Sequence, residues 1–74
     1  MRAREWEVVR DALLLLGCEQ YHENDMHFVV ARAATHFQTI RKSMVPIEIQ
    51  LDVIRALYLD QRDYESAIQW ALGK

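Results

Sequence analysis

Residues that break or cross-link a chain are scarce in this sequence. Its 74 residues include one cysteine, one proline and two isolated glycines. A single cysteine, Cys18, excludes a disulfide within the chain and suits a reducing compartment better than a secreted scaffold. Two separated glycines cannot form a glycine-rich loop that cradles phosphate. With so few breaks, the chain is expected to consist mostly of regular secondary structure.

Strong charge of one sign and long apolar runs are also missing. The formal net charge is −2, whereas tight non-specific nucleic-acid binding normally needs a basic surface. The longest apolar run, residues 12–16, is far shorter than the roughly 20 residues that span a membrane. Acidic residues near the N-terminus, Glu5, Glu7 and Asp11, argue against a signal or transit peptide. We therefore expect a cytoplasmic protein that makes no membrane contact.

Apolar side chains, by contrast, are abundant. They make up 51% of the sequence, which is at the upper end for a soluble domain. Residues 1–74 form one domain, and a chain this short buries only about 60% of its unfolded surface. Some of the apolar surface is therefore expected to face a second copy of the chain or another protein.

The spacing of the apolar residues predicts an all-α protein, a compact bundle of three to four short helices with short connections. The first helix is expected over residues 3–16, with Gly17 as the left-handed residue that ends it. Asn24 or Asp25 would cap a second helix that runs to about Lys42. The stripe that predicts this second helix consists of Met26, Val29, Ala33, Phe37 and Ile40.

Pro46 is placed to begin a third helix, because its missing N–H group costs nothing in the first turn. The fourth helix is expected over residues 64–72, with Asp63 as its N-cap and Gly73 at its end. In the alternative interpretation, one continuous helix passes through residues 60–63.

Within residues 51–72, Tyr58, Tyr64 and Ala67 follow one another at intervals of six and three. This spacing resembles the second tyrosine-like, third aromatic and first alanine positions of one tetratricopeptide-repeat hairpin. Arg55 and Arg62 depart from it, because the repeat prefers small residues or glycine there, and Ala71 stands where it prefers an aromatic. The resemblance covers under a third of the chain and implies a helix–turn–helix hairpin, without assigning the family.

Catalysis and metal binding are both disfavoured. Cys18, His22 and His27 are residue types that bind zinc, and Glu19, Glu23 and Asp25 are further candidate ligands. Their spacing fits no standard zinc finger, and a structural site needs four ligands. A nucleophile also needs a base, an orienting group and a walled cleft, which a small bundle rarely provides. We expect no catalytic residues, no metal and no cofactor.

The first functional hypothesis is a small non-enzymatic regulatory or adaptor protein that acts through helix-mediated protein–protein contacts as a homodimer. Trp70 is expected to lie off the core stripe of the last helix, and exposed tryptophans are enriched in binding hot spots. The expected interface residues are Trp70, Leu72, Ile68 and Leu14. The protein partner remains unidentified.

The alternative hypothesis is a nucleic-acid-associated regulator that uses a local basic face on the second helix. The residues expected on that face are Arg32, His36, Arg41 and Lys42. The net negative charge disfavours this alternative, since contacts with phosphate supply much of the affinity in such complexes.

Overall fold

The protein is an α+β fold, and the prediction of an all-α bundle was wrong. The computed structural model describes every residue from Met1 to Lys74. It contains five strands and three helices. In chain order they are β1 (Arg4–Glu5), α1 (Trp6–Leu15), β2 (Glu19–Glu23), β3 (His27–Arg32), β4 (His36–Arg41), β5 (Met44–Val45), α2 (Ile47–Ala56) and α3 (Gln61–Leu72).

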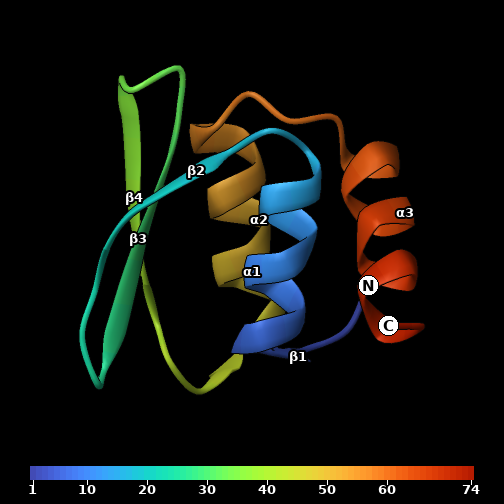
Figure 1. Ribbon diagram of the computed structural model, residues 1–74. Coiled ribbons are helices and arrows are strands. Elements are labelled where there is room, and N and C mark those ends of the chain that lie inside the picture. Colours follow the sequence, from blue (N-terminus) through green and yellow to red (C-terminus); the bar gives the residue numbers. More distant parts are fainter.

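Three of the strands form an antiparallel sheet in the order β2-β3-β4. Figure 1 shows that α1 and α2 lie on one face of this sheet, whereas no helix covers the other face. The third helix, α3, lies beyond α1 and packs chiefly against it. The short strands β1 and β5 pair with each other below the helices. One face of the sheet therefore belongs to the core, and the opposite face is open.

The first helix was predicted over residues 3–16; its end is confirmed, but it starts three residues later than predicted, because Arg4 and Glu5 form β1. In the structure α1 begins at Trp6 and ends at Leu15, and Gly17 has a φ of 91°. The Gly17 N–H donates to the Leu14 carbonyl and the Cys18 N–H to the Leu13 carbonyl, both at 3.1 Å. This pair of bonds is the Schellman motif, which needs a left-handed residue where the glycine stands.

The second predicted helix does not exist, because residues 27–41 form the β3–β4 hairpin. Asn24 does satisfy N–H groups, as expected of a capping residue, but it does so in the β2–β3 turn. Its Oδ1 accepts hydrogen bonds from the N–H groups of Met26 and His27, both at 2.8 Å. Asparagine serves turns and helix caps by the same chemistry, so the residue alone does not distinguish them.

The turn between β3 and β4 contains none of the usual turn residues. Ala33 and Ala34 both adopt left-handed backbone conformations, with φ of 55° and 57°. The Thr35 N–H donates to the Arg32 carbonyl at 3.2 Å, which closes the turn. The loop between the register partners Arg32 and His36 has three residues. Two positive φ values at the centre of its four-residue turn, Arg32 to Thr35, are the requirement of a type I′ turn, which normally selects Asn-Gly. The alanines therefore concealed the hairpin and suggested helix instead.

Two helices follow, and they are separate, which excludes one continuous helix. Pro46 is the N-cap of α2, and the helix begins at Ile47, one residue later than expected. Asp60, and not Asp63, caps α3, because its Oδ1 accepts from the Asp63 N–H at 3.1 Å. The helix–turn–helix order implied by the tetratricopeptide resemblance is present, but α3 packs chiefly on α1 and not as a close hairpin on α2.

The core lies between the sheet and the helices. Its fully buried side chains include Val9 and Leu13 of α1, Phe28 and Val30 of β3, and Leu57 after α2. One polar side chain, Gln50, is buried among them. Its Nε2 donates to the carbonyls of Arg2 and Val45, and its Oε1 accepts from the Tyr64 hydroxyl at 2.8 Å. Gln50 thus ties the N-terminal segment to both α2 and α3.

Candidate functional site: the open face of the sheet

The four residues of the predicted basic helix face do not form one surface. Arg32 and His36 are register partners at the end of the β3–β4 hairpin. The Arg32 guanidinium donates to the carbonyls of Leu57 and Tyr58 at the end of α2. A cation there complements the helix dipole, so Arg32 has a structural role. The His36 ring lies 4.8 Å from the Tyr58 ring, centroid to centroid.

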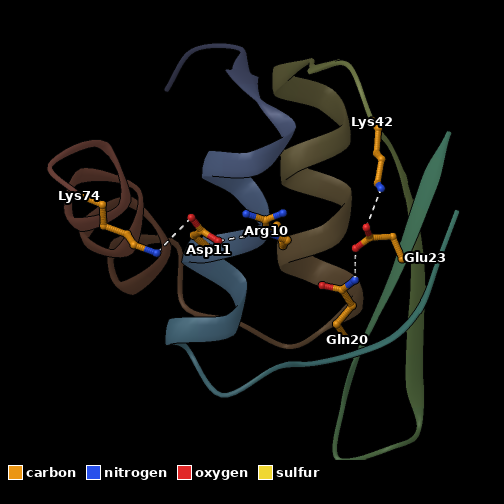
Figure 2. A network of polar contacts seen from close by, with 6 residues as sticks. All are labelled: Arg10, Asp11, Gln20, Glu23, Lys42 and Lys74. Carbon is orange, nitrogen blue, oxygen red and sulfur yellow. Dashed lines mark hydrogen bonds and ion pairs between the residues drawn. The ribbon is translucent and has the colours of Figure 1, made fainter. Parts of the chain in front are cut away.

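Lys42 is also engaged within the protein. Figure 2 shows its ammonium group pointing at Glu23, with an Nζ–Oε2 distance of 2.8 Å. Gln20 donates to the same carboxylate. These hydrogen bonds from Lys42 and Gln20 hold the pKa of the Glu23 carboxyl below its usual range. Lys42 lies over the Trp6 ring as well, 4.9 Å from its centroid. Of the four predicted residues, only Arg41 has no partner.

The predicted protein-interface residues divide into exposed and buried ones. Trp70 and Leu72 of α3 are each 46% exposed, and Leu14 of α1 is 40% exposed. Ile68 is only 4% exposed and belongs to the core. Because α1 and α3 run in opposite directions, their C-terminal ends lie at opposite ends of the molecule (Figure 1). Leu14 therefore does not share a patch with Trp70 and Leu72.

The residues weighed as metal ligands are not gathered into a site. No three His, Cys, Asp or Glu side chains lie close enough together to hold a metal ion. Cys18 is buried in the core, and this burial raises the pKa of its thiol. His22 and His27 belong instead to the sheet, where their positions are set by strand register.

The open face of the sheet follows from strand alternation. Successive side chains of a strand point to opposite faces, and directly paired residues share a face. Phe28 pairs with Ile40 and both are buried, so they mark the face that the helices cover. The residues between them define the other face. Its members on β3 and β4 are the register pairs His27–Arg41, Val29–Thr39 and Ala31–Phe37.

An aromatic pair stands on this open face. The register of β2 with β3 shifts between Gln20 and His22, so that Tyr21 occupies a bulge. The Tyr21 and Phe37 rings meet edge to face, with centroids 5.1 Å apart and planes at 72°. The two side chains are 47% and 49% exposed. Large aromatic rings left half in water on an uncovered sheet commonly mark a binding surface.

A cavity of about 400 Å³ adjoins the open face at the free edge of β4. Polar side chains that line it are His27, Thr39, Arg41 and Ser43. Its apolar wall comes from β5 and the start of α2, including Met44 and Ile49. No carboxylate lines the cavity. A concave site with one guanidinium, one imidazole and two hydroxyls is suited to an anionic group.

The pairing of the other cations shows why Arg41 is distinctive. Arg10 and Lys74 both contact Asp11, as Figure 2 shows, and Arg55 contacts Asp52. With Arg32 and Lys42 engaged as described, five of the nine basic side chains have partners. The remaining four are Arg2, Arg4, Arg41 and Arg62. Arg41 is the one among them that belongs to the three-stranded sheet.

Sequence reasoning missed this face because it assigned the segment to a helix. Phe37 was expected on the apolar stripe of that helix, and Tyr21 lay between the predicted helices. The β3 segment gives no alternating signal, because Phe28 to Ala31 are all apolar. In β4, a spacing of two places Phe37, Thr39 and Arg41 on one face. That pattern reads as a mixed polar and aromatic strand face once the chain is assigned to strands.

No helix in the structure combines the length and the apolar character needed to cross a membrane. Comparison of the chain with protein-family models, curated proteins and solved structures finds no match.

Proposed function

We propose that the protein binds single-stranded nucleic acid on the open face of its three-stranded sheet. The observation that supports the proposal is an exposed aromatic pair, Tyr21 and Phe37, beside a cavity that is free of carboxylates and is lined by the unpaired Arg41. This retains the nucleic-acid alternative but replaces the helix face with a sheet face. A cytoplasmic location is part of the proposal, since a lone free thiol suits a reducing compartment.

The aromatic pair would bind bases. Every nucleobase has a π-face, so stacking on an exposed ring tolerates any sequence and contributes about 1–3 kcal/mol per base. Sheets that bind single-stranded RNA use aromatic side chains in this way. A base in a duplex is already stacked on its neighbours, so the proposed surface favours unpaired strands.

The cavity would bind a phosphate of the same strand. From Phe37 to Arg41 is four residues along β4, or about 13 Å at 3.3 Å per residue. A strand that stacks on Phe37 can therefore extend along β4 towards Arg41. The guanidinium can donate two parallel N–H bonds to one phosphate, and Thr39 and Ser43 supply hydroxyl donors.

The net charge of −2 limits how electrostatic this binding is. One guanidinium neutralises about one phosphate, which corresponds to a slope of about −0.7 in log K against log salt for a single strand. Stacking, which is insensitive to salt, would supply most of the affinity. Binding that weakens only a few-fold between low and physiological salt is therefore expected, in contrast to proteins with several phosphate contacts.

Anisotropy of a labelled single strand, titrated with the protein, tests the proposal. Phe37→Ala should weaken binding by about 5- to 150-fold, since a stacking partner contributes about 1–3 kcal/mol. Tyr58→Ala is the matched control, because Tyr58 is an exposed aromatic at the end of α2, away from this face. Arg41→Gln should weaken binding and flatten the salt dependence, whereas Arg55→Gln on α2 should do neither. Equal effects of Phe37→Ala and Tyr58→Ala would refute the assignment.

Binding without cleavage is the expected activity. His27 is the one imidazole in the cavity, and no carboxylate, lysine, tyrosine or cysteine lines it beside the histidine. General acid–base cleavage usually needs a second positioned group. The labelled strand should therefore keep its length after prolonged incubation, and time-dependent shortening that His27→Ala removes would contradict a pure binding role.

A second candidate function, protein contact through α3, is favoured by one observation. Trp70 and Leu72 are both exposed at the C-terminal end of that helix, and the Lys74 ammonium lies 5.1 Å from the centroid of the Trp70 ring. The proposed partner is a second copy of the chain. Light scattering across a dilution series should then show a dimer that Trp70→Ala dissociates. A monomer at every concentration would exclude this candidate.

A further inference from the structure

A second cavity, of about 450 Å³, lies on the helical side of the protein between β1, α2 and α3. It shares no lining residue with the cavity at the edge of β4. Its volume falls within the range of about 300–1,000 Å³ that is usual for small-molecule sites. Among its lining residues are two arginines, Arg4 of β1 and Arg62 of α3, and one acid, Glu65.

Neither arginine has a partner in the protein. The ion pairs of the structure involve Arg10, Lys42, Arg55 and Lys74, and Arg32 donates to backbone carbonyls. Of the four arginines without partners, three line the two cavities: Arg41 lines one, and Arg4 and Arg62 line the other. Two guanidinium groups around one concavity repel each other and remain available to an anion.

The floor of this cavity is rigid. Tyr64 is almost fully buried, and its hydroxyl donates to the Oε1 of Gln50, whose own N–H groups bind two backbone carbonyls. Burial raises the pKa of the Tyr64 hydroxyl well above its usual range, although Arg4 lowers it in part, so the hydroxyl keeps its proton. Every buried polar atom of the floor is satisfied, so the groups left to bind a ligand are those on the walls.

We propose that this cavity binds a small phosphorylated molecule, whose phosphate group bridges Arg4 and Arg62. A carboxylate has two oxygens, and one guanidinium fork occupies both. A terminal phosphate has three oxygens and a charge near −2, so it can accept from two forks at once. Ser66 and Gln69 on the wall are positioned to bind neutral polar parts of the same molecule.

Such a ligand would join the N-terminal segment to the last helix. Arg4 belongs to β1, which pairs with β5, whereas Arg62 lies in the first turn of α3. Because these elements lie far apart in the chain, a ligand that binds both stabilises the folded protein over the unfolded chain. A rise in melting temperature with ligand concentration is therefore expected along with binding.

The test titrates the full chain with inorganic phosphate or pyrophosphate, and with acetate at matched ionic strength as the control. Binding is measured from amide shifts in two-dimensional NMR. Saturable shifts are expected for residues 4 and 62–69. Arg62→Gln alters an exposed side chain and should weaken binding by on the order of tenfold, the effect of losing one charge-assisted contact. Arg4→Gln should do the same, whereas Arg55→Gln should have no effect.

The variant Arg41→Gln distinguishes phosphate binding in this cavity from phosphate binding in the cavity at the edge of β4. Phosphate binding that survives Arg41→Gln but not Arg62→Gln supports the second site, whether or not nucleic acid binds the sheet. Phosphate binding lost in Arg41→Gln and retained in the double variant Arg4→Gln/Arg62→Gln would overturn it, and so would acetate binding as tightly as phosphate. The absence of any saturable shift at residues 62–69 would likewise overturn it.

Discussion

The turn between β3 and β4 provides a test in which a hairpin and a helix predict opposite changes in the free energy of unfolding. The change is the double substitution Ala33→Asn/Ala34→Gly. Both alanines have positive φ, 55° and 57°, and the left-handed conformation costs an ordinary L-residue roughly 1–2 kcal/mol. Asn-Gly is the pair that a type I′ turn prefers, so the substitution removes much of this cost at both positions.

The expected gain is smaller than the sum of the two costs. Glycine increases the conformational entropy of the unfolded chain, which offsets about 0.4–1 kcal/mol. The net increase in the free energy of unfolding should be about 1–2 kcal/mol. For a domain of this size, each 1 kcal/mol raises the melting temperature by roughly 4–8 °C. If residues 24–42 formed a helix, the same substitution would destabilise by about 1–2 kcal/mol through helix propensity.

Thermal and urea unfolding followed by circular dichroism measure this difference. Ala31→Gly is the matched control, because Ala31 lies in β3 within the same hairpin and does not have a positive φ. That variant should lose about 0.5–1 kcal/mol. A lower melting temperature for the Asn-Gly variant, with an unchanged dependence on urea, would refute the hairpin.

Three further predictions concern stability. Gln50→Ala should lower the free energy of unfolding by about 2–4 kcal/mol in urea titrations, because it leaves the Tyr64 hydroxyl and two carbonyls without partners. Arg32→Gln should lower the free energy of unfolding by about 1–2 kcal/mol, since the Arg32 guanidinium binds carbonyls at the end of α2. The variant should still bind single-stranded nucleic acid, and loss of that binding in a folded variant would contradict the structural role. Burial opposes the ionisation of Asp11, but hydrogen bonds from Arg10 and Lys74 outweigh it and lower the pKa of its carboxyl. Its folded pKa is below its unfolded pKa, so its contribution is complete above about pH 5 and is lost as the pH falls below about 4. Asp11→Asn should therefore reduce stability at neutral pH and converge with the natural protein in acid; a constant difference would contradict the assignment.

The parts of the fold that the sequence predicts are those where local chemistry and burial agree. The stripe of α1 and the left-handed Gly17 specify one helix and its end. Pro46 fixes the start of α2 within one residue, and Gly73 follows the last residue of α3. In each case the residue type has few other uses, so the local signal was sufficient.

The sheet was missed for reasons that lie in particular residues. Val29 is partly covered on the open face and Val30 is buried in the core, so β3 reads as a continuous apolar run without alternation. The strand β2 consists of five exposed residues, and its polar side chains read as a loop. Both segments become strands because they pair with each other and with β4, and a single sequence does not show this pairing.

The candidate site depended on the sheet and could not be assembled without it. Arg41 was predicted on one basic helix face with Arg32 and Lys42, whose partners are visible only in three dimensions. Phe37 changes from a core residue to an exposed one when its segment becomes a strand. The Tyr21 and Phe37 rings meet only because of the register of β2 with β3 and of β3 with β4.

Mapping a short single strand onto the protein by NMR tests the central claim most directly. The amide and side-chain signals that shift on titration should belong to Tyr21 of β2, to His27 and Val29 of β3, and to the segment from Phe37 to Ser43. Signals of α3 should not move. Shifts confined to α3, or none at concentrations where anisotropy reports binding, would contradict a nucleic-acid surface on the open face of the sheet.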